Sequence, residues 1–250
     1  MVTTRYPGRP DRYAASSTVV ARPVGDATAG PDVAGLCPTG AITTDPGSPV
    51  RVDIGRCIAC GRCVRARPDL FGWAPGSEVA QPVRDALVVP RRAETDDAVR
   101  AVRAELSART RALGRSAHVR HVDAGSDGAD EWEVLALLNP VYDVHRLGIF
   151  FTASPRHADI LLVTGVGTHG MAGPLRRTLE GMPQPTVVIA AGVDAVSGGL
   201  LAPTYAVAGG IGDLVPVDVW VPGSPPTPFS LLHALLLAVG RLPGRTGAER

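Results

Sequence analysis

Lysine is absent from this 250-residue sequence, and all 25 of its basic residues are arginine. Because the arginines recur in segments that share no other feature, we attribute this bias to the composition of the genome. The net charge is only +1, which argues against a general nucleic-acid-binding protein. No long apolar run is present either. The longest, residues 231–239, is too short to span a membrane and predicts a buried helix.

Cysteine is also scarce, and the four cysteines form one pattern. Cys57, Cys60 and Cys63 make a C-x2-C-x2-C run, and Cys37 lies upstream with Pro38 directly after it. In two-cluster bacterial ferredoxins the run is C-x2-C-x2-C-x3-C-P, and its fourth cysteine binds the other cluster. The spacing therefore resembles parts of two ferredoxin runs.

The two partial runs complement each other. In the first, the three places before Cys37 lack sulfur and hold Ala27, Gly30 and Val33. In the second, Arg67 occupies the fourth place. The four remaining cysteines predict the complete ligand set of one [4Fe–4S] cluster, and so one electron-carrying site.

Disulfides and zinc are the alternatives for these cysteines. A chain of this length without a signal peptide does not need disulfides for stability. A structural zinc site usually pairs two C-x2-C motifs, which a compact triplet and a remote Cys-Pro match poorly. Iron–sulfur ligation fits better, and reduced thiols without a targeting segment predict a cytoplasmic protein.

Positive charge gathers around the cysteine triplet. Between residues 51 and 67 five arginines stand against Asp53 alone. The five are Arg51, Arg56, Arg62, Arg65 and Arg67. Such a rim would either dock an acidic redox partner or offset the negative charge of the cluster, and the sequence leaves both open.

The second half of the chain alternates strands with helices. Strands are predicted at residues 118–122, 160–164, 187–191 and 215–221, and their continuous Val, Ile and Leu runs are typical of a mostly parallel sheet covered on both faces. Helices are predicted at residues 131–138, at 174–181 with proline near the first turn, and from Thr227-Pro228 onward. Upstream, a turn at 45–48 precedes a strand at 50–54, and an amphipathic helix at 95–113 ends at Gly114.

Several motifs in this half are shared with one family. They are His121-Val-Asp-Ala-Gly-Ser126, Ala153-Ser-Pro-Arg-His-Ala-Asp-Ile-Leu-Leu-Val-Thr-Gly165, Met182-Pro-Gln-Pro185, Pro216-Val-Asp-Val219 and Pro222-Gly-Ser-Pro-Pro226. Residues 118–240 thereby resemble the small subunits of group 4 [NiFe] hydrogenases, the formate hydrogenlyase type included, and the B subunit of respiratory complex I. The resemblance implies a flavodoxin-like domain that holds the cluster nearest the active site of a large partner subunit.

The cysteine ligands of that proximal cluster are replaced here. The family's C-x-x-C-E becomes Asp127 to Asp130 followed by Glu131, its Gly-Asp-Cys ends in Asp194, and its Pro-Gly-Cys-Pro-Pro contains Ser224. Oxygen ligands are too hard to be expected to hold such a cluster.

Three close carboxylates cannot all remain ionised without help. They would form an ion pair with Arg156 or with an arginine of the partner, bind Mg²⁺ or Ca²⁺, or line a solvated pocket. We favour the ion pair or the solvated pocket.

The expected fold class is α/β, with an N-terminal ferredoxin-like α+β unit followed by a flavodoxin-like, doubly wound and mostly parallel sheet. The expected division is a flexible arm at 1–26, a ferredoxin-like domain at 27–92, a linker helix at 93–114, the α/β domain at 115–242 and a tail at 243–250.

We predict an electron-transfer subunit that carries one [4Fe–4S] cluster and performs no independent catalysis. It would work with a large hydrogenase-like or complex I-like subunit, with membrane-embedded subunits and, if the arginine rim is a docking surface, with an acidic redox partner. It would lie at the inner face of the plasma membrane through these partners. The alternative is a structural or redox-sensing scaffold subunit.

Overall fold

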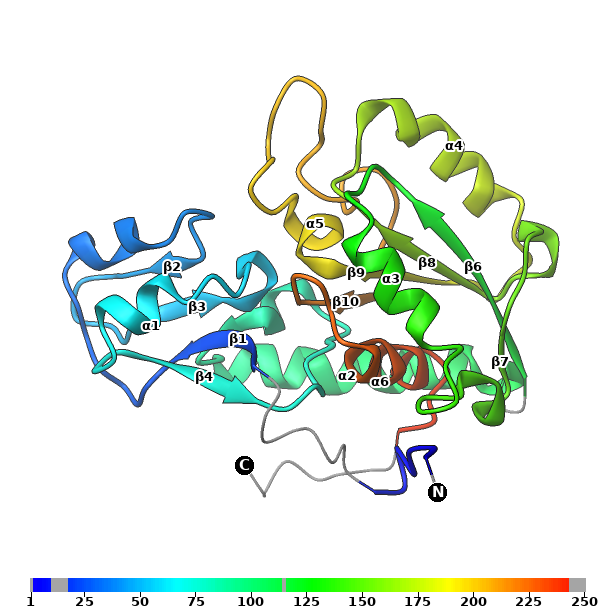
Figure 1. The fold of residues 1–250 in the computed structure, drawn as a ribbon, viewed down its shortest axis with the longest axis horizontal. Helices are drawn as coiled ribbons and strands as arrows, with labels where there is room; N and C mark the ends of the chain where they lie inside the picture. The colour runs from blue at the N-terminus through cyan, green and yellow to red at the C-terminus, as the bar shows by residue number, and fades with distance from the viewer. Residues whose placement is uncertain (1, 10–17, 114–115, 243–250) are drawn as a thin grey trace.

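A computed structural model describes residues 2–9, 18–113 and 116–242 (Figure 1). Its largest sheet has five parallel strands in the order β10-β9-β8-β6-β7. The strands are β6 (Ala117–Asp123), β7 (Ile149–Phe151), β8 (Ile160–Thr164), β9 (Val187–Ala191) and β10 (Val219–Val221). Counted from β6, this is the flavodoxin order 2-1-3-4-5. The flavodoxin-like α/β fold class is therefore confirmed.

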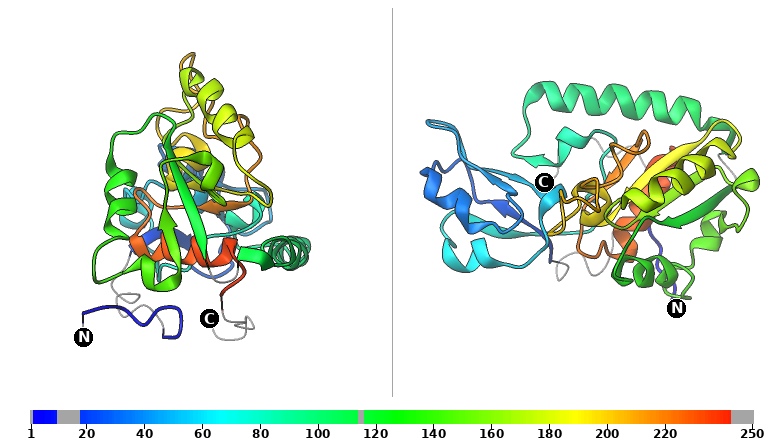
Figure 2. Two further views of the ribbon diagram at one scale, coloured as in Figure 1. Left: turned by 90° about the vertical axis from the view of Figure 1, so that its right-hand side faces the viewer. Right: turned by 90° about the horizontal axis from the view of Figure 1, so that it is seen from above.

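Helices cover both faces of this sheet (Figures 1 and 2). One face packs against α4 (His169–Glu180) and α5 (Gly192–Ser197). The other packs against α2 (Ala93–Arg109), α3 (Ala129–Ala136) and α6 (Pro228–Ala238). Within β8, Leu161 and Val163 belong to the first layer, whereas Ile160 and Leu162 belong to the second. Because both faces are covered, every residue of β8 and β9 is buried, which explains their uninterrupted apolar sequences.

Helix α6 forms as its sequence predicts. The side chain of Thr227 accepts a hydrogen bond from the backbone N–H of Ser230, and Pro228 occupies the first turn. All 11 residues of the helix are buried. Among the described residues, no helix combines the length and the apolar character that crossing a bilayer requires.

The N-terminal unit contains two small antiparallel sheets. One pairs β1 (Thr18–Pro23) with β4 (Phe71–Pro75). The other has the order β2-β3-β5, formed by β2 (Ile42–Thr43), β3 (Arg51–Asp53) and β5 (Val88–Val89). The short helix α1 (Arg62–Ala66) and the 3-10 helices η1 (Pro31–Leu36), η2 (Ile54–Arg56) and η3 (Arg84–Leu87) complete the unit.

The two units share one packed core. A Cβ added to Gly55 in η2 would lie only 2.8 Å from the Val196 side chain of α5, so the backbone of η2 packs directly on that helix. Gln81 exchanges two backbone hydrogen bonds of 2.9 and 2.8 Å with Trp220 in β10. This bridge covers part of the open edge that β10 would otherwise present to solvent.

The structure differs from the expected arm at residues 1–26. Residues 18–23 form β1, in which Val20 and Ala21 are buried because they pair with β4 over the core of the N-terminal unit. Tyr6 is 1% exposed and packs edge-on against Phe229 with the ring centroids 5.8 Å apart. Residues 1 and 10–17 of the arm, and the tail at 243–250, lie outside the described residues.

Three predicted boundaries also shift. Helix α4 begins at His169, so Pro174 lies inside the helix and not in its first turn. Two nearby glycines with weak helix propensity, Gly170 and Gly173, concealed this earlier start. Strand β10 is three residues long instead of the predicted seven. Helix α2 ends at Arg109 and is followed by a 3-10 turn at Arg111–Leu113. The predicted helix stop, Gly114, lies outside the described residues.

Candidate functional site

Cys57 and Cys60 lie in a tightly curled loop that connects η2 to α1, and Cys63 is the second residue of α1. Ala59 and Gly61 both adopt the left-handed backbone conformation, with φ of 52° and 68°. At Gly61 a Cβ would lie 2.9 Å from the ring of Trp73, so a larger residue would collide as well as strain the backbone. Cys57 is buried at the start of this loop, and Cys60 is exposed at its tip.

Burial and neighbouring cysteines act on the thiols of Cys57 and Cys63. Burial is the main cause that raises the pKa of Cys57 and of Cys63, and repulsion from the other cysteines raises both further. Hydrogen bonds from the backbone of Ala21 and Ala59 act in the opposite direction on Cys57. Loss of the thiol protons is therefore costly unless a positively charged metal centre compensates.

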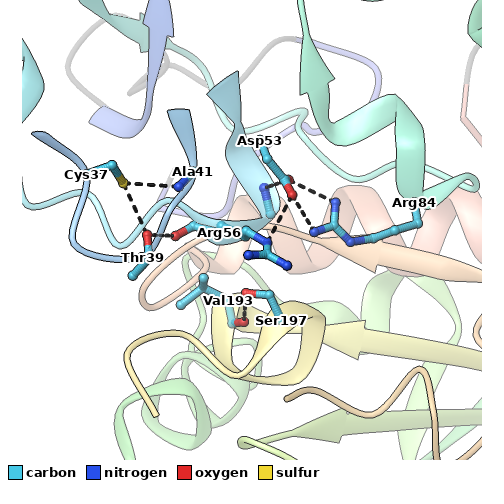
Figure 3. A network of polar contacts seen from close by, with 9 residues as sticks. Cys37, Thr39, Ala41, Asp53, Arg56, Arg84, Val193 and Ser197 are labelled. Atoms are coloured by element: carbon cyan, nitrogen blue, oxygen red, sulfur yellow. Dashed lines mark hydrogen bonds and ion pairs between the residues drawn. The ribbon is translucent and has the colours of Figure 1, made fainter. Parts of the chain in front are cut away.

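Cys37 is held beside the same loop by polar contacts (Figure 3). Its Sγ accepts a hydrogen bond of 3.3 Å from the backbone N–H of Ala41 and lies 3.3 Å from Thr39 Oγ1. Thr39 Oγ1 in turn donates a hydrogen bond of 2.6 Å to the carbonyl oxygen of Arg56, the residue before Cys57. The Cys37 segment and the triplet are thus joined through one side chain.

The turn of η2 that delivers Cys57 has its own anchor. Asp53 Oδ1 accepts from the backbone N–H of Gly55 at 2.9 Å. The two carboxylate oxygens of Asp53 also accept hydrogen bonds of 2.9 and 2.7 Å from Arg84 in η3. This bidentate ion pair fixes the direction in which the chain enters the cysteine loop. Figure 3 shows this ion pair together with the α5 residues Val193 and Ser197.

The donor chemistry of this region fits an iron–sulfur cluster. It combines four soft sulfur donors with backbone N–H groups directed at sulfur, which are features of such sites. Within residues 2–9, 18–113 and 116–242, however, no three His, Cys, Asp or Glu side chains are arranged as closely as a metal ion would require.

Three acidic residues meet at the carboxyl ends of the parallel strands. Asp127 and Asp130 follow β6, and Asp194 follows β9 in the first turn of α5. Asp130 is 6% exposed, and its carboxylate lies over Gly192, whose Cβ, if present, would be 2.3 Å from Asp130 Oδ2. Burial, followed by repulsion from Asp194, Glu131 and Asp127, raises the pKa of Asp130 to about 8. Asp130 is therefore mainly protonated at neutral pH.

Asp194 is affected in the same direction. Burial, together with the charges of Asp127 and Glu131, raises its pKa above the ordinary range. The structure therefore brings the three predicted aspartates together. Ser224 is exposed, and its neighbour Gly223 accepts a backbone hydrogen bond of 2.8 Å from Val193, which places the Ser224 loop beside α5.

The expected arginine partner is not seen at these carboxylates. The ion pairs of the described residues include none between Arg156 and Asp127, Asp130 or Asp194. Arg156 lies instead in the 3-10 turn Pro155–His157 that precedes β8.

Sequence reasoning missed a polar network beside the aspartates. Glu131 accepts a hydrogen bond of 2.7 Å from Ser126 Oγ and another from Thr164 Oγ1. Thr164 Oγ1 also lies 2.9 Å from His121 Nε2. Burial is the main cause that lowers the pKa of His121, although the Glu131 charge opposes it. The position of Thr164 at the carboxyl end of a buried strand was the available signal.

Comparisons with known proteins agree with the motifs. The sequence profile of the NADH ubiquinone oxidoreductase 20 Kd subunit family matches residues 128–238. Formate hydrogenlyase subunit 7 of Escherichia coli (strain K12) is 40% identical over 159 residues, which are 64% of this chain and 61% of that protein. The chain thus spans 61% of the length of that relative.

Two further similarities concern archaeal proteins. The probable membrane-bound hydrogenase subunit mbhJ of Pyrococcus furiosus is 40% identical over 130 residues, 52% of this chain and 78% of that protein. A chain in the structure of the membrane-bound sulfane sulfur reductase, an archaeal respiratory membrane complex, is 28% identical with a TM-score of 0.44, covering 53% of this chain and 71% of that one. The profile match and the extensive coverage of the hydrogenase subunit show that the chain belongs to the family of the NADH ubiquinone oxidoreductase 20 Kd subunit.

Proposed function

We propose that this chain is the electron-transfer subunit of a hydrogenase-related or complex I-related, membrane-associated oxidoreductase. Its relatives are named as subunits of formate hydrogenlyase and of a membrane-bound hydrogenase, which supports a role as one subunit among several. The observation that carries the proposal is the gathering of Cys37, Cys57, Cys60 and Cys63, with backbone N–H donors, in the N-terminal unit. This unit would act as the one-cluster, ferredoxin-like part of the chain.

Each part of the cysteine loop has a task in this proposal. A [4Fe–4S] cluster, when bound, accepts and releases one electron at a time. The four thiolates would hold it, and the buried position of Cys57 keeps water from one side. The backbone N–H of Ala41 stabilises negative charge on Cys37, and Asp53 with Arg84 holds η2 in place. Because burial raises the pKa of Cys57 and of Cys63, binding must release protons from these thiols and will weaken as the pH falls.

The α/β unit would contribute no second cluster. Asp127, Asp130, Asp194 and Ser224 stand where the family resemblance expects cysteine, and oxygen donors do not replace thiolates around iron–sulfur cubes. We propose that Asp130 carries a proton at neutral pH and that the remaining carboxylates are solvated or meet a cation of the large partner subunit. The partner would carry the chemistry, and the chain would reach the membrane only through other subunits.

Iron content tests the proposal directly. The chain is purified without oxygen, iron and sulfide are measured per chain, and EPR spectra are recorded after dithionite reduction. We expect about four irons and one reduced-cluster signal, as for a single [4Fe–4S] cube. Cys57→Ser should lose most of the iron, whereas Asp194→Asn should retain it. About eight irons, or iron that survives Cys57→Ser and disappears in Asp194→Asn, would contradict the proposal.

A scaffold function is the second candidate, because loss of every proximal thiol interrupts the relay expected for the family. In that case the cluster would stabilise the N-terminal unit or sense redox state. Reversible reduction of the cluster at low potential favours electron transfer. A cluster that stays oxidised under excess dithionite favours the scaffold.

A further inference from the structure

Most of the arginines around the cysteine loop are already neutralised or half-buried. Arg67 pairs with Asp69 at 2.7 Å, and Arg56 pairs with Asp53 at 3.6 Å. Arg51 is half-buried in β3. Of these three, only Arg67 has a carboxylate of its own within the described part of the chain, because Arg56 shares Asp53 with Arg84. Arg51 is less accessible than the arginines of α1.

Of the five arginines between residues 51 and 67, the two that are both exposed and unpaired lie on α1. Arg62 and Arg65 are exposed, and neither has an ion pair among residues that the structure describes. Cys60, the exposed cysteine, lies two residues before Arg62. Trp73 is 37% exposed, and both its ring and Arg65 Nη1 lie 2.9 Å from the place that a Cβ of Gly61 would take. We call Cys60, Arg62, Arg65 and Trp73 the α1 face.

We propose that the α1 face is the docking surface for an acidic protein that carries one electron. The inference rests on the proposed function and adds to it the place and charge of the exchange. One electron would pass from the reduced centre of the carrier to the cluster at Cys60, leaving the carrier oxidised by one electron and transferring no atoms. Two unpaired arginines provide electrostatic complementarity and steering, and the Trp73 ring provides an apolar contact.

The net charge of the whole chain strengthens this assignment. At +1 the chain has almost no overall field, so attraction of an acidic carrier must come from a local excess of positive charge. On the α1 face that excess adjoins the exposed cysteine, where a bound cluster would lie nearest to solvent. Docking there would shorten the path of the electron.

The test uses the full chain, with and without its reconstituted cluster, and a plant-type [2Fe–2S] ferredoxin as the acidic probe. Arg62→Glu/Arg65→Glu is compared with Arg5→Glu/Arg111→Glu, which makes the same change of charge at exposed arginines outside the α1 face, one in residues 2–9 and one in the 3-10 turn Arg111–Leu113. Binding of fluorescently labelled ferredoxin is followed by anisotropy, and cluster reduction is followed by stopped-flow absorbance. Reduction by methyl viologen radical, a small cation, reports whether the cluster itself is intact.

We expect the double substitution Arg62→Glu/Arg65→Glu to weaken ferredoxin binding and to slow reduction of the cluster by ferredoxin about tenfold at low ionic strength. The effect should be smaller at high salt. Reduction by viologen should not slow, and the control pair should have little effect. If both double variants weaken ferredoxin binding equally, or if neither does while about four irons stay bound, the docking surface is overturned but the proposed function is not. Binding to phosphatidylserine vesicles that requires Arg62 and Arg65, without ferredoxin binding, would overturn it in favour of a lipid surface. A chain that binds no iron would overturn the proposed function and this inference together.

Discussion

Replacing Asp130 by asparagine should stabilise the protein in a strongly pH-dependent way. The carboxyl group is 6% exposed, and burial with nearby acidic residues raises its pKa to about 8. In the unfolded chain the pKa of an aspartate is about 3.9. Between these values the folded state holds a proton that the unfolded state has released. Stability that is fully present below about pH 4 is therefore lost as the pH rises towards 8.

The size of the effect follows from the difference between the two pKa values. Each unit corresponds to about 1.4 kcal/mol, so the cost of keeping Asp130 reaches at most about 4 kcal/mol at pH 7. Asp194 titrates in the same group and shares part of this cost. For Asp130→Asn we expect a gain of about 2–4 kcal/mol in the free energy of unfolding at pH 7 and almost none at pH 4.

Urea denaturation followed by circular dichroism at several pH values measures this gain. Asp213→Asn removes a charge from an exposed position and serves as the control. A constant gain from pH 4 to 7 in Asp130→Asn would refute the reasoning, because it would show that the Asp130 carboxyl does not hold its proton in the folded state. A loss of stability at every pH would show that the carboxyl makes a stabilising contact.

Two further substitutions test the packing around both sites. Arg84→Ala should lower the free energy of unfolding by about 1–3 kcal/mol, because the half-buried Asp53 carboxylate loses its bidentate partner. Urea denaturation at pH 7 measures this loss. A change below about 0.5 kcal/mol would contradict the anchoring role of the ion pair. Gly192→Ala should cost more than 2 kcal/mol, because its Cβ would collide with Asp130 and its φ is 92°. Gly170→Ala, inside α4 with open space around its Cβ, is the matched control and should stabilise by about 0.5–1 kcal/mol. Equal thermal midpoints for the two alanine variants would disprove the predicted collision.

The sequence was most informative where burial on two sides leaves a continuous apolar run. The strands predicted at residues 160–164 and 187–191 are β8 and β9 residue for residue, since covered parallel strands have no polar alternation to obscure them. The start of α6 was equally clear, because Thr227 and Pro228 provide both the cap and the first turn. Edge and terminal segments were less clear. The three β-branched residues at 18–20 are too short a run to predict by themselves a strand whose partner, β4, lies about fifty residues later.

The candidate functional sites were likewise predictable only in part. The parallel sheet and the family motifs placed Asp127, Asp130 and Asp194 at one end of the strands, and the structure brings them together. Spacing alone did not reveal that Asp130 would be the buried member, because this depends on the close approach of Gly192 across the sheet. The ligand role of the four cysteines stays a prediction from their spacing.

The bridge between Gln81 and Trp220 makes the two halves of the chain dependent on each other. An α/β unit produced alone would lose this cover over its outermost strand and would expose Val196, which now packs against Gly55. The N-terminal unit thus covers a strand edge and an apolar side chain that its neighbour would otherwise expose. Unfolding of the N-terminal unit would accordingly leave an unpaired strand edge on the α/β unit, which is a template for aggregation.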